Sequence, residues 1–373
     1  MLNLIFFAVF GALSLVGILL WVQAIKRINN RQCIVDPLGE RDLVGSPLGL
    51  IDVFVVFFAW FGGQLIAAGL ALFILNVPFD EITSLEGELQ AKFMGIVGAG
   101  QLVLTLGVLV IIWVRYQSNL SSISVKPKFV FRDVLLGFAS FVMVIPFILL
   151  LQWVLALLVP YEHASLNMLT KDASVMTFAL VWFTAGIVAP ITEEVVFRGF
   201  IQAFLQRLGR GRGRMNLEQI FVGGWDGSVV QAKKPEPEVR PEETTGDGKS
   251  EAVENESAVA NPYQSPLPIQ NESETLVAQS WYANSWWPIL ATSGFFAFMH
   301  IGQGAAPIPL FVFACVLGYL FQKTGSILPC IVLHMLLNVF SLFWYTVNVF
   351  FGVVPEPTVA APKVACLLDC WFW

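Results

Sequence analysis

Long runs of apolar residues, separated by short polar stretches, are the dominant pattern of this 373-residue chain. The runs do not alternate with a period of two, so they predict helices rather than strands. Most of them supply the roughly 20 apolar residues that one helix needs to cross a bilayer, although the sixth and seventh are short. We expect helices over residues 2–24, 50–76, 94–114, 134–159, 174–208, 286–302, 306–322 and 327–352. The predicted fold is an all-α, polytopic transmembrane bundle of about eight membrane-spanning helices.

The composition supports a protein that has the lipid bilayer as its main solvent. Hydrophobic residues make up 56% of the chain, charged residues only 13%, and the mean hydropathy is +0.72. A soluble chain usually carries about 25% charged residues. The net charge of -6 argues against a nucleic-acid partner, because no basic face of useful size remains. The first apolar run has no basic n-region and no small-residue cleavage site, so we expect it to be retained as a span.

The basic residues predict which side of the membrane each loop faces. If the spans simply alternate, most lysines and arginines between them fall on one side, which the positive-inside rule makes the cytoplasm. They are Lys26, Arg27, Arg31, Arg115, Lys126, Lys128, Arg132, Arg207, Arg210, Arg212, Arg214 and Lys323. Both termini are therefore predicted to be non-cytoplasmic.

The fifth segment, 174–208, is too long for one straight crossing. At 1.5 Å per residue it would measure about 50 Å, against a hydrocarbon core of about 30 Å. Either Pro190 kinks the helix or its end lies along the interface. A helix that continues past Pro190 places the acids that follow it inside the bundle.

A polar stretch divides the fifth and sixth predicted helices. Residues 235–257 contain eight acids and three prolines, a composition that cannot bury enough apolar surface to fold. We expect 216–284 to be a mostly disordered, acidic cytoplasmic loop, and a tolerated insertion is favoured over a regulatory docking site. The predicted organisation is N-terminal transmembrane helices over 1–165, a helical core over 174–352 that contains the loop, and a C-terminal tail over 353–373.

Ionisable residues at the end of the fifth run are the first candidates for chemistry. Each charge in hydrocarbon costs about 2.5 to 3.5 kcal/mol, so charges that lie there usually serve a function. Glu194 and Arg198 are four residues apart with the acid first, the favoured order for an ion pair on one helix face. Glu193 is rotated by about 100° and is left to face another group. It is a candidate base, or it closes the same ion-pair network.

Two further polar groups lie on the later apolar helices. His300 follows Phe296 by four residues and is flanked by Gly302 and Gly304, which permit a break in the chain. His334 and Asn338 stack on one helix face, where both can donate hydrogen bonds to one point, as an oxyanion site requires. Each of these residues alone fits an interhelical hydrogen bond equally well.

Together the three groups indicate hydrolysis with water as the nucleophile. They supply a base, a charge-balancing arginine and two oxyanion donors, whereas no Ser–His or Cys–His pattern, HExxH motif or glycine-rich phosphate loop occurs. Buried Glu, His and Arg also form proton relays, so a proton-coupled membrane transporter is an alternative. A non-catalytic membrane scaffold or immunity protein is a third interpretation.

The motifs EExxxR, FxxxH and HxxxN, in this order on successive apolar helices, resemble those of the CAAX prenyl protease and bacteriocin-processing (CPBP or Abi) family. They comprise Glu193, Glu194, Arg198, Phe296, His300, His334 and Asn338. The resemblance covers about residues 174–352. It implies a membrane-embedded endopeptidase with an active site open to the cytoplasm, acting on a membrane-associated protein or peptide.

The resemblance also implies a role for each motif residue. Glu193 and His300 would activate the attacking water. His334 and Asn338 would stabilise the tetrahedral oxyanion, and Glu194 with Arg198 would support the site. The chain departs from the family pattern in one respect, because the acidic loop separates the first two motifs by more than a hundred residues.

The family is often described as metalloproteases, so the resemblance raises the question of a metal. Zinc is the candidate, and Glu193, His300 and His334 would be its ligands. We expect no cofactor, because such a chelate leaves Asn338 without a role and the chain lacks a recognisable zinc spacing. The sequence does not separate prenylated proteins from other membrane peptides as substrates, and it leaves the oligomeric state open.

Overall fold

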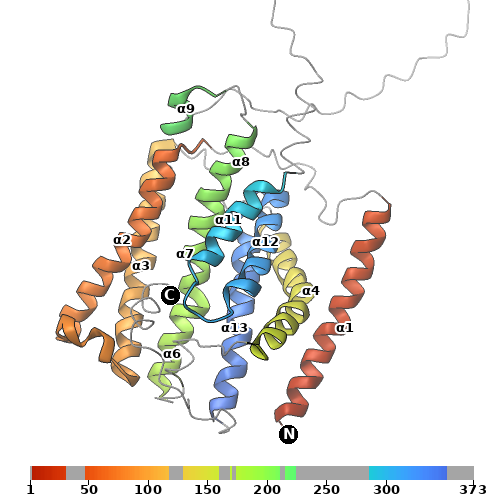
Figure 1. Cartoon of the computed structure of the whole chain (residues 1–373), viewed down its shortest axis with the longest axis horizontal. Coiled ribbons are helices and arrows are strands. Elements are labelled where there is room, and N and C mark those ends of the chain that lie inside the picture. The colour runs from red at the N-terminus through yellow and green to blue at the C-terminus, as the bar shows by residue number, and fades with distance from the viewer. Residues whose placement is uncertain are drawn as a thin grey trace, which may run out of the picture.

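The chain folds into a bundle of long apolar helices (Figure 1). The structure, a computed structural model, describes residues 2–30, 47–116, 129–158, 169, 174–210, 215–223 and 285–350, and it contains no strand in these ranges. Seven helical segments within them are long and apolar enough to cross a membrane. The predicted all-α, polytopic bundle is therefore confirmed, and the chain is an integral, multi-pass membrane protein.

Six of these seven segments are single helices. They are α1 (Leu2–Asn29), α2 (Leu50–Leu75), α3 (Gly87–Tyr116), α4 (Val130–Ala156), α12 (Pro307–Thr324) and α13 (Leu328–Phe350). A short 3₁₀ helix, η1 (Phe79–Ser84), connects α2 to α3. Many large apolar side chains on these helices are exposed, as expected for surfaces that face lipid.

The seventh segment is a composite rod that carries the paired acids. It consists of α6 (Val175–Phe183), the π-helical turn η3 (Thr184–Val188), α7 (Ala189–Glu194), the π-helical turn η4 (Val195–Gln202) and α8 (Ala203–Arg210). The helix does continue past Pro190, as predicted, and the wide turn η3 comes immediately before this proline. Short π-helical stretches occur most often at functional sites, so the position of the acids between two of them is informative.

The helices pack as neighbouring pairs around two clusters of buried apolar residues. The pairs are α2 with α3, α4 with α13, α1 with α4, α3 with α6, and α11 with α12. Figure 1 shows the composite rod, α12 and α13 in the middle of the bundle, with α2 and α3 on one side and α1 on the other. Phe200, Phe296 and Phe313 are fully buried where these central helices meet.

The sixth predicted span, 286–302, is corrected by the structure. Only α11 (Trp287–Phe298) is helical there, and its 12 residues rise about 18 Å, too little to cross a bilayer. Met299 to Ala306 form turns, in which Gly302 (φ +116°) and Gly304 (φ +61°) adopt positive φ angles. Figure 1 shows α11 and α12 as a hairpin whose turn lies along the length of α13 rather than beyond its end. The break that the two glycines suggested is therefore present, inside the bundle.

The predicted disordered loop begins later than residue 216. Asn216 caps a short helix, α9 (Leu217–Phe221), by accepting a hydrogen bond from the Gln219 backbone N–H. The Val222 carbonyl that follows accepts a bond from Arg115 Nη2 at 2.8 Å. The first residues of this segment are thus held against the end of α3. The remainder of the predicted loop, 224–284, and the predicted tail, 353–373, lie outside the described residues.

Candidate active site

Glu194 and Arg198 form the buried ion pair that their spacing predicts. Arg198 Nη1 lies 3.2 Å from Glu194 Oε1, and neither side chain is exposed. Arg198 Nη2 also donates to the Ala314 carbonyl at 3.2 Å, and its guanidinium lies 5.0 Å from the centre of the Phe296 ring. Because the two opposite charges are paired inside the bundle, each offsets part of the cost of burying the other.

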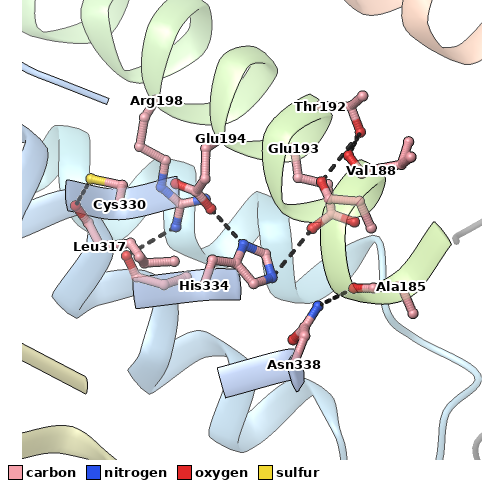
Figure 2. Close-up of polar contacts among 12 residues, drawn as sticks. Ala185, Val188, Thr192, Glu193, Glu194, Arg198, Leu317, Cys330, His334 and Asn338 are labelled. Atoms are coloured by element: carbon pink, nitrogen blue, oxygen red, sulfur yellow. Dashed lines mark hydrogen bonds and ion pairs between the residues drawn. The ribbon is translucent and has the colours of Figure 1, made fainter. Parts of the chain in front are cut away.

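His334 connects this ion pair to the other acid. Its Nδ1 lies 2.8 Å from Glu194 Oε1, and its Nε2 lies 3.9 Å from Glu193 Oε2. Figure 2 shows the imidazole between the two carboxylates, with Arg198 on the far side of Glu194. A carboxylate oxygen accepts the Nδ1–H bond, so the ring is fixed with Nε2 directed toward Glu193. The composite rod and α13 thus place four polar groups in a row, Arg198, Glu194, His334 and Glu193.

His300 lies beside this row, in the turn after α11. Its Nδ1 is 2.7 Å from the Phe296 carbonyl, which only accepts hydrogen bonds, so Nδ1 carries the proton and a neutral ring leaves Nε2 as an acceptor. The Phe296 ring is in contact with both histidines, 4.7 Å from His300 and 6.1 Å from His334 between ring centres. The FxxxH motif therefore brings His300 to the same aromatic side chain as His334.

Asn338 is engaged with the backbone of η3. Its Nδ2 donates to the Ala185 carbonyl at 2.8 Å, as Figure 2 shows. In π-helical pairing the donor for Ala185 would be the residue five positions later, which is Pro190 and has no N–H. Asn338 supplies the missing donor. Nδ2 carries two hydrogens, and one of them remains for another acceptor.

A ladder of three polar contacts, missed by the sequence reasoning, fixes α12 against the composite rod. Arg198 contacts the Ala314 carbonyl, Gln202 Nε2 donates to the Gly318 carbonyl at 2.8 Å, and Gln206 Nε2 lies 3.3 Å from Gln322 Oε1. The donors on the rod are four residues apart, and so are their partners on α12. The sequence did hold one signal, because Arg198, Gln202 and Gln206 form a single polar stripe within an otherwise apolar helix.

A pocket adjoins Glu193 on the side of α2 and α3. It encloses about 460 Å³, including the part that is open to the outside. Its lining comprises Trp60, Gln64, Phe93, Met94, Val97, Gly98, Gln101, Thr184, Val188, Ala189, Thr192 and Glu193. Glu193 is thus positioned between the pocket and His334.

The arrangement does not provide a chelating set for a metal ion. No group of three or more His, Cys, Asp or Glu side chains within the described ranges is placed to hold one. Glu193 and His334 are the two donors that come close, and Nδ1 of His334 is already bonded to Glu194. The candidate ligands Glu193, His300 and His334 do not form such a group.

Comparison with known protein families gives a match over two segments of the chain. Residues 175–228 and 274–340 match the family described as "Rce1-like: Type II CAAX prenyl endopeptidase Rce1-like". No curated protein and no solved structure matches the chain. The two matched segments contain all three motifs, so the predicted resemblance to the CAAX prenyl proteases is confirmed, and it supports a membrane protease as the class of enzyme. The α2 and α3 helices, which form one wall of the pocket, lie outside the match.

Proposed function

We propose that this chain, whose C-terminal half matches the Rce1-like CAAX proteases, is an intramembrane endopeptidase in which Glu193 activates water for attack on a peptide bond. The observation that carries the proposal is the buried pair of Glu193 and His334, held in place by Glu194 and Arg198. The substrate class is a membrane-associated protein or peptide.

The spacing of Glu193 and His334 suits one water molecule. A water about 2.8 Å from both Glu193 Oε2 and His334 Nε2, which are 3.9 Å apart, would make an angle of about 90° at its oxygen. When Glu193 is ionised and His334 carries a proton on Nε2 as well as on Nδ1, the water donates to Glu193 Oε2 and accepts from His334 Nε2–H. The position is therefore that of a nucleophile in contact with a base.

In the proposed reaction, the water oxygen bonds to the substrate carbonyl carbon while its proton passes to Glu193. The carbonyl oxygen becomes an oxyanion, which His334 Nε2–H and the second Nδ2 hydrogen of Asn338 stabilise. The C–N bond then breaks, and the proton on Glu193 moves to the leaving amine. His300, whose Nε2 is an acceptor when neutral, assists Glu193 in orienting the water.

The direct test is peptide hydrolysis by the purified full chain in lipid vesicles. A library of peptides with apolar segments is incubated with the protein, and the products are identified by mass spectrometry. We expect internal cleavage with one water added across the cut bond. Failure to cut any membrane-inserted or prenylated peptide, together with proton-coupled uptake of a solute, would favour a transporter instead.

We expect hydrolysis to persist after exhaustive treatment with a strong chelator. The reason is that Glu193 and His334 provide too few ligands for tight binding of zinc, which usually takes three protein ligands in a catalytic site. The measurement is the initial rate before and after chelation, followed by readdition of zinc. A loss of activity that zinc restores would replace the metal-free mechanism by a metal-assisted one.

We also propose that the active site opens to the cytoplasm and that both chain ends are on the opposite side. Lys26, Arg27, Arg115 and Lys323 occupy the last turns of α1, α3 and α12, which supports a cytoplasmic location for that end. A cysteine introduced at Glu218, an exposed residue of α9, should react with an impermeant thiol reagent only after the membrane is permeabilised. Labelling in intact cells would reverse the orientation.

A further inference from the structure

Gln64 stands out among the polar side chains of the pocket beside Glu193. It lies in the middle of α2 and is 6% exposed, yet its amide has no hydrogen-bond partner within the described part of the chain. Neither atom of its amide is among the fully buried atoms that lack a partner, so the amide is accessible from the pocket that it lines. A ligand in the pocket could therefore complete the hydrogen bonds of this amide.

The other neutral polar residues of the pocket have partners inside the protein. Thr192 Oγ1 donates to the Val188 carbonyl at 3.0 Å, and Thr184 Oγ1 donates to the Leu180 carbonyl at 2.8 Å. With its amide oxygen oriented toward the indole, Gln101 accepts from Trp60 Nε1 at 2.8 Å. Gln64 and Glu193 are therefore the two pocket residues that have polar groups to offer a ligand.

We propose that Gln64 binds the backbone of the substrate peptide on the α2–α3 side of Glu193. A primary amide has one acceptor and two donors, so it can pair with both the N–H and the C=O of a peptide group. Phe93, Met94 and Val97 line the same pocket and offer an apolar surface to the side chain of the bound residue. An extended peptide with an apolar residue next to the cut bond is the ligand class that these groups fit.

The inference rests on the proposed protease function and adds a role for helices outside the family match. Glu193 comes from the matched segment, whereas Gln64 comes from α2. The N-terminal helices would then contribute to substrate selection as well as to membrane anchoring. Gln64 is a positioning residue here, because it contacts the peptide beside the reacting bond and takes no part in proton transfer.

The test replaces Gln64 by methionine, which has a similar length and no hydrogen-bonding amide. We expect KM to rise about tenfold, with kcat changed less than twofold, because the hydrogen bonds between the amide and the peptide backbone are lost. We also expect the thermal midpoint to stay the same, since the Gln64 amide makes no hydrogen bond within the described part of the chain. A purely structural role would leave KM unchanged, and that result would overturn the inference.

A modified substrate links the effect to the peptide backbone. Peptides in which a single backbone N–H next to the cut bond is replaced by an ester oxygen are compared on both forms of the protein. At one position the ester should raise KM about tenfold for the unmutated protein, and much less for the Gln64→Met protein. Equal losses at every position would show that Gln64 does not contact the backbone.

A matched control comes from the other buried polar residue of this helix pair that lacks a partner. Thr105 Oγ1 on α3 is buried and unpaired, and it lines a different pocket. Thr105→Val should leave KM unchanged. If the unmutated protein cleaves the peptide and Glu193→Gln does not, an unchanged KM in Gln64→Met contradicts only the role of Gln64. If the unmutated protein does not cleave any peptide, the proposed protease function itself is wrong.

Discussion

Replacing Glu193 by glutamine is expected to lower the rate of peptide hydrolysis by at least about a hundredfold, the usual contribution of a general base. Glutamine has the same shape and keeps a hydrogen-bonding group 3.9 Å from His334 Nε2, so the helix packing should persist. It cannot accept the water proton at neutral pH. The measurement is kcat/KM for a cleaved peptide, together with the thermal midpoint in detergent.

The control for this variant is the same chemical change at a surface residue that does not line the pocket. Glu88 on α3 is about half exposed and pairs with Lys92 on its own helix. Glu88→Gln should keep full activity, because exposed ion pairs contribute little to stability. Undiminished turnover in the Glu193→Gln protein would remove Glu193 as the base.

The long helices and the first ion pair could be predicted because they depend on local sequence. Continuous apolar runs locate α2, α4 and α13 to within a few residues. The spacing of Glu194 and Arg198 fixes their contact, because four residues make about one turn of a single helix. These features need no knowledge of how one helix lies against another.

The contacts between helices could not be predicted, because they depend on packing. The sequence predicted that His334 and Asn338 act at the oxyanion and that His300 acts with Glu193. It did not show that His334 lies between the two acids or that Asn338 donates to the Ala185 carbonyl. That carbonyl lacks a donor only because a π-helical turn precedes Pro190, and apolar periodicity does not reveal such a turn.

Hydropathy also could not distinguish a helix that crosses the membrane from one that turns back inside the bundle. Residues 286–302 are as apolar as a short span, yet α11 ends at Phe298. The turn after it holds His300 beside the Phe296 ring within the bundle. Because α11 is shorter than a full crossing, the turn that follows it places His300 inside the bundle.

Removing the charge of Arg198 is expected to be the most destabilising single change near the site. Arg198→Met leaves Glu194 buried without its cation and also deletes the contacts with the Ala314 carbonyl and the Phe296 ring. Breaking a buried pair by removing one partner typically costs about 3–5 kcal/mol. We expect a much lower thermal midpoint in detergent and little active protein in the membrane.

The double variant Glu194→Gln, Arg198→Met separates folding from catalysis. With both charges gone, no uncompensated charge is buried, so most of the stability lost in Arg198→Met should return. The glutamine still accepts from His334 Nδ1, but without the carboxylate the ring is held less firmly toward Glu193. Loss of such a supporting group commonly costs about 10- to 100-fold in activity. A double variant that regains both stability and full turnover would show that Glu194 only balances the charge of Arg198.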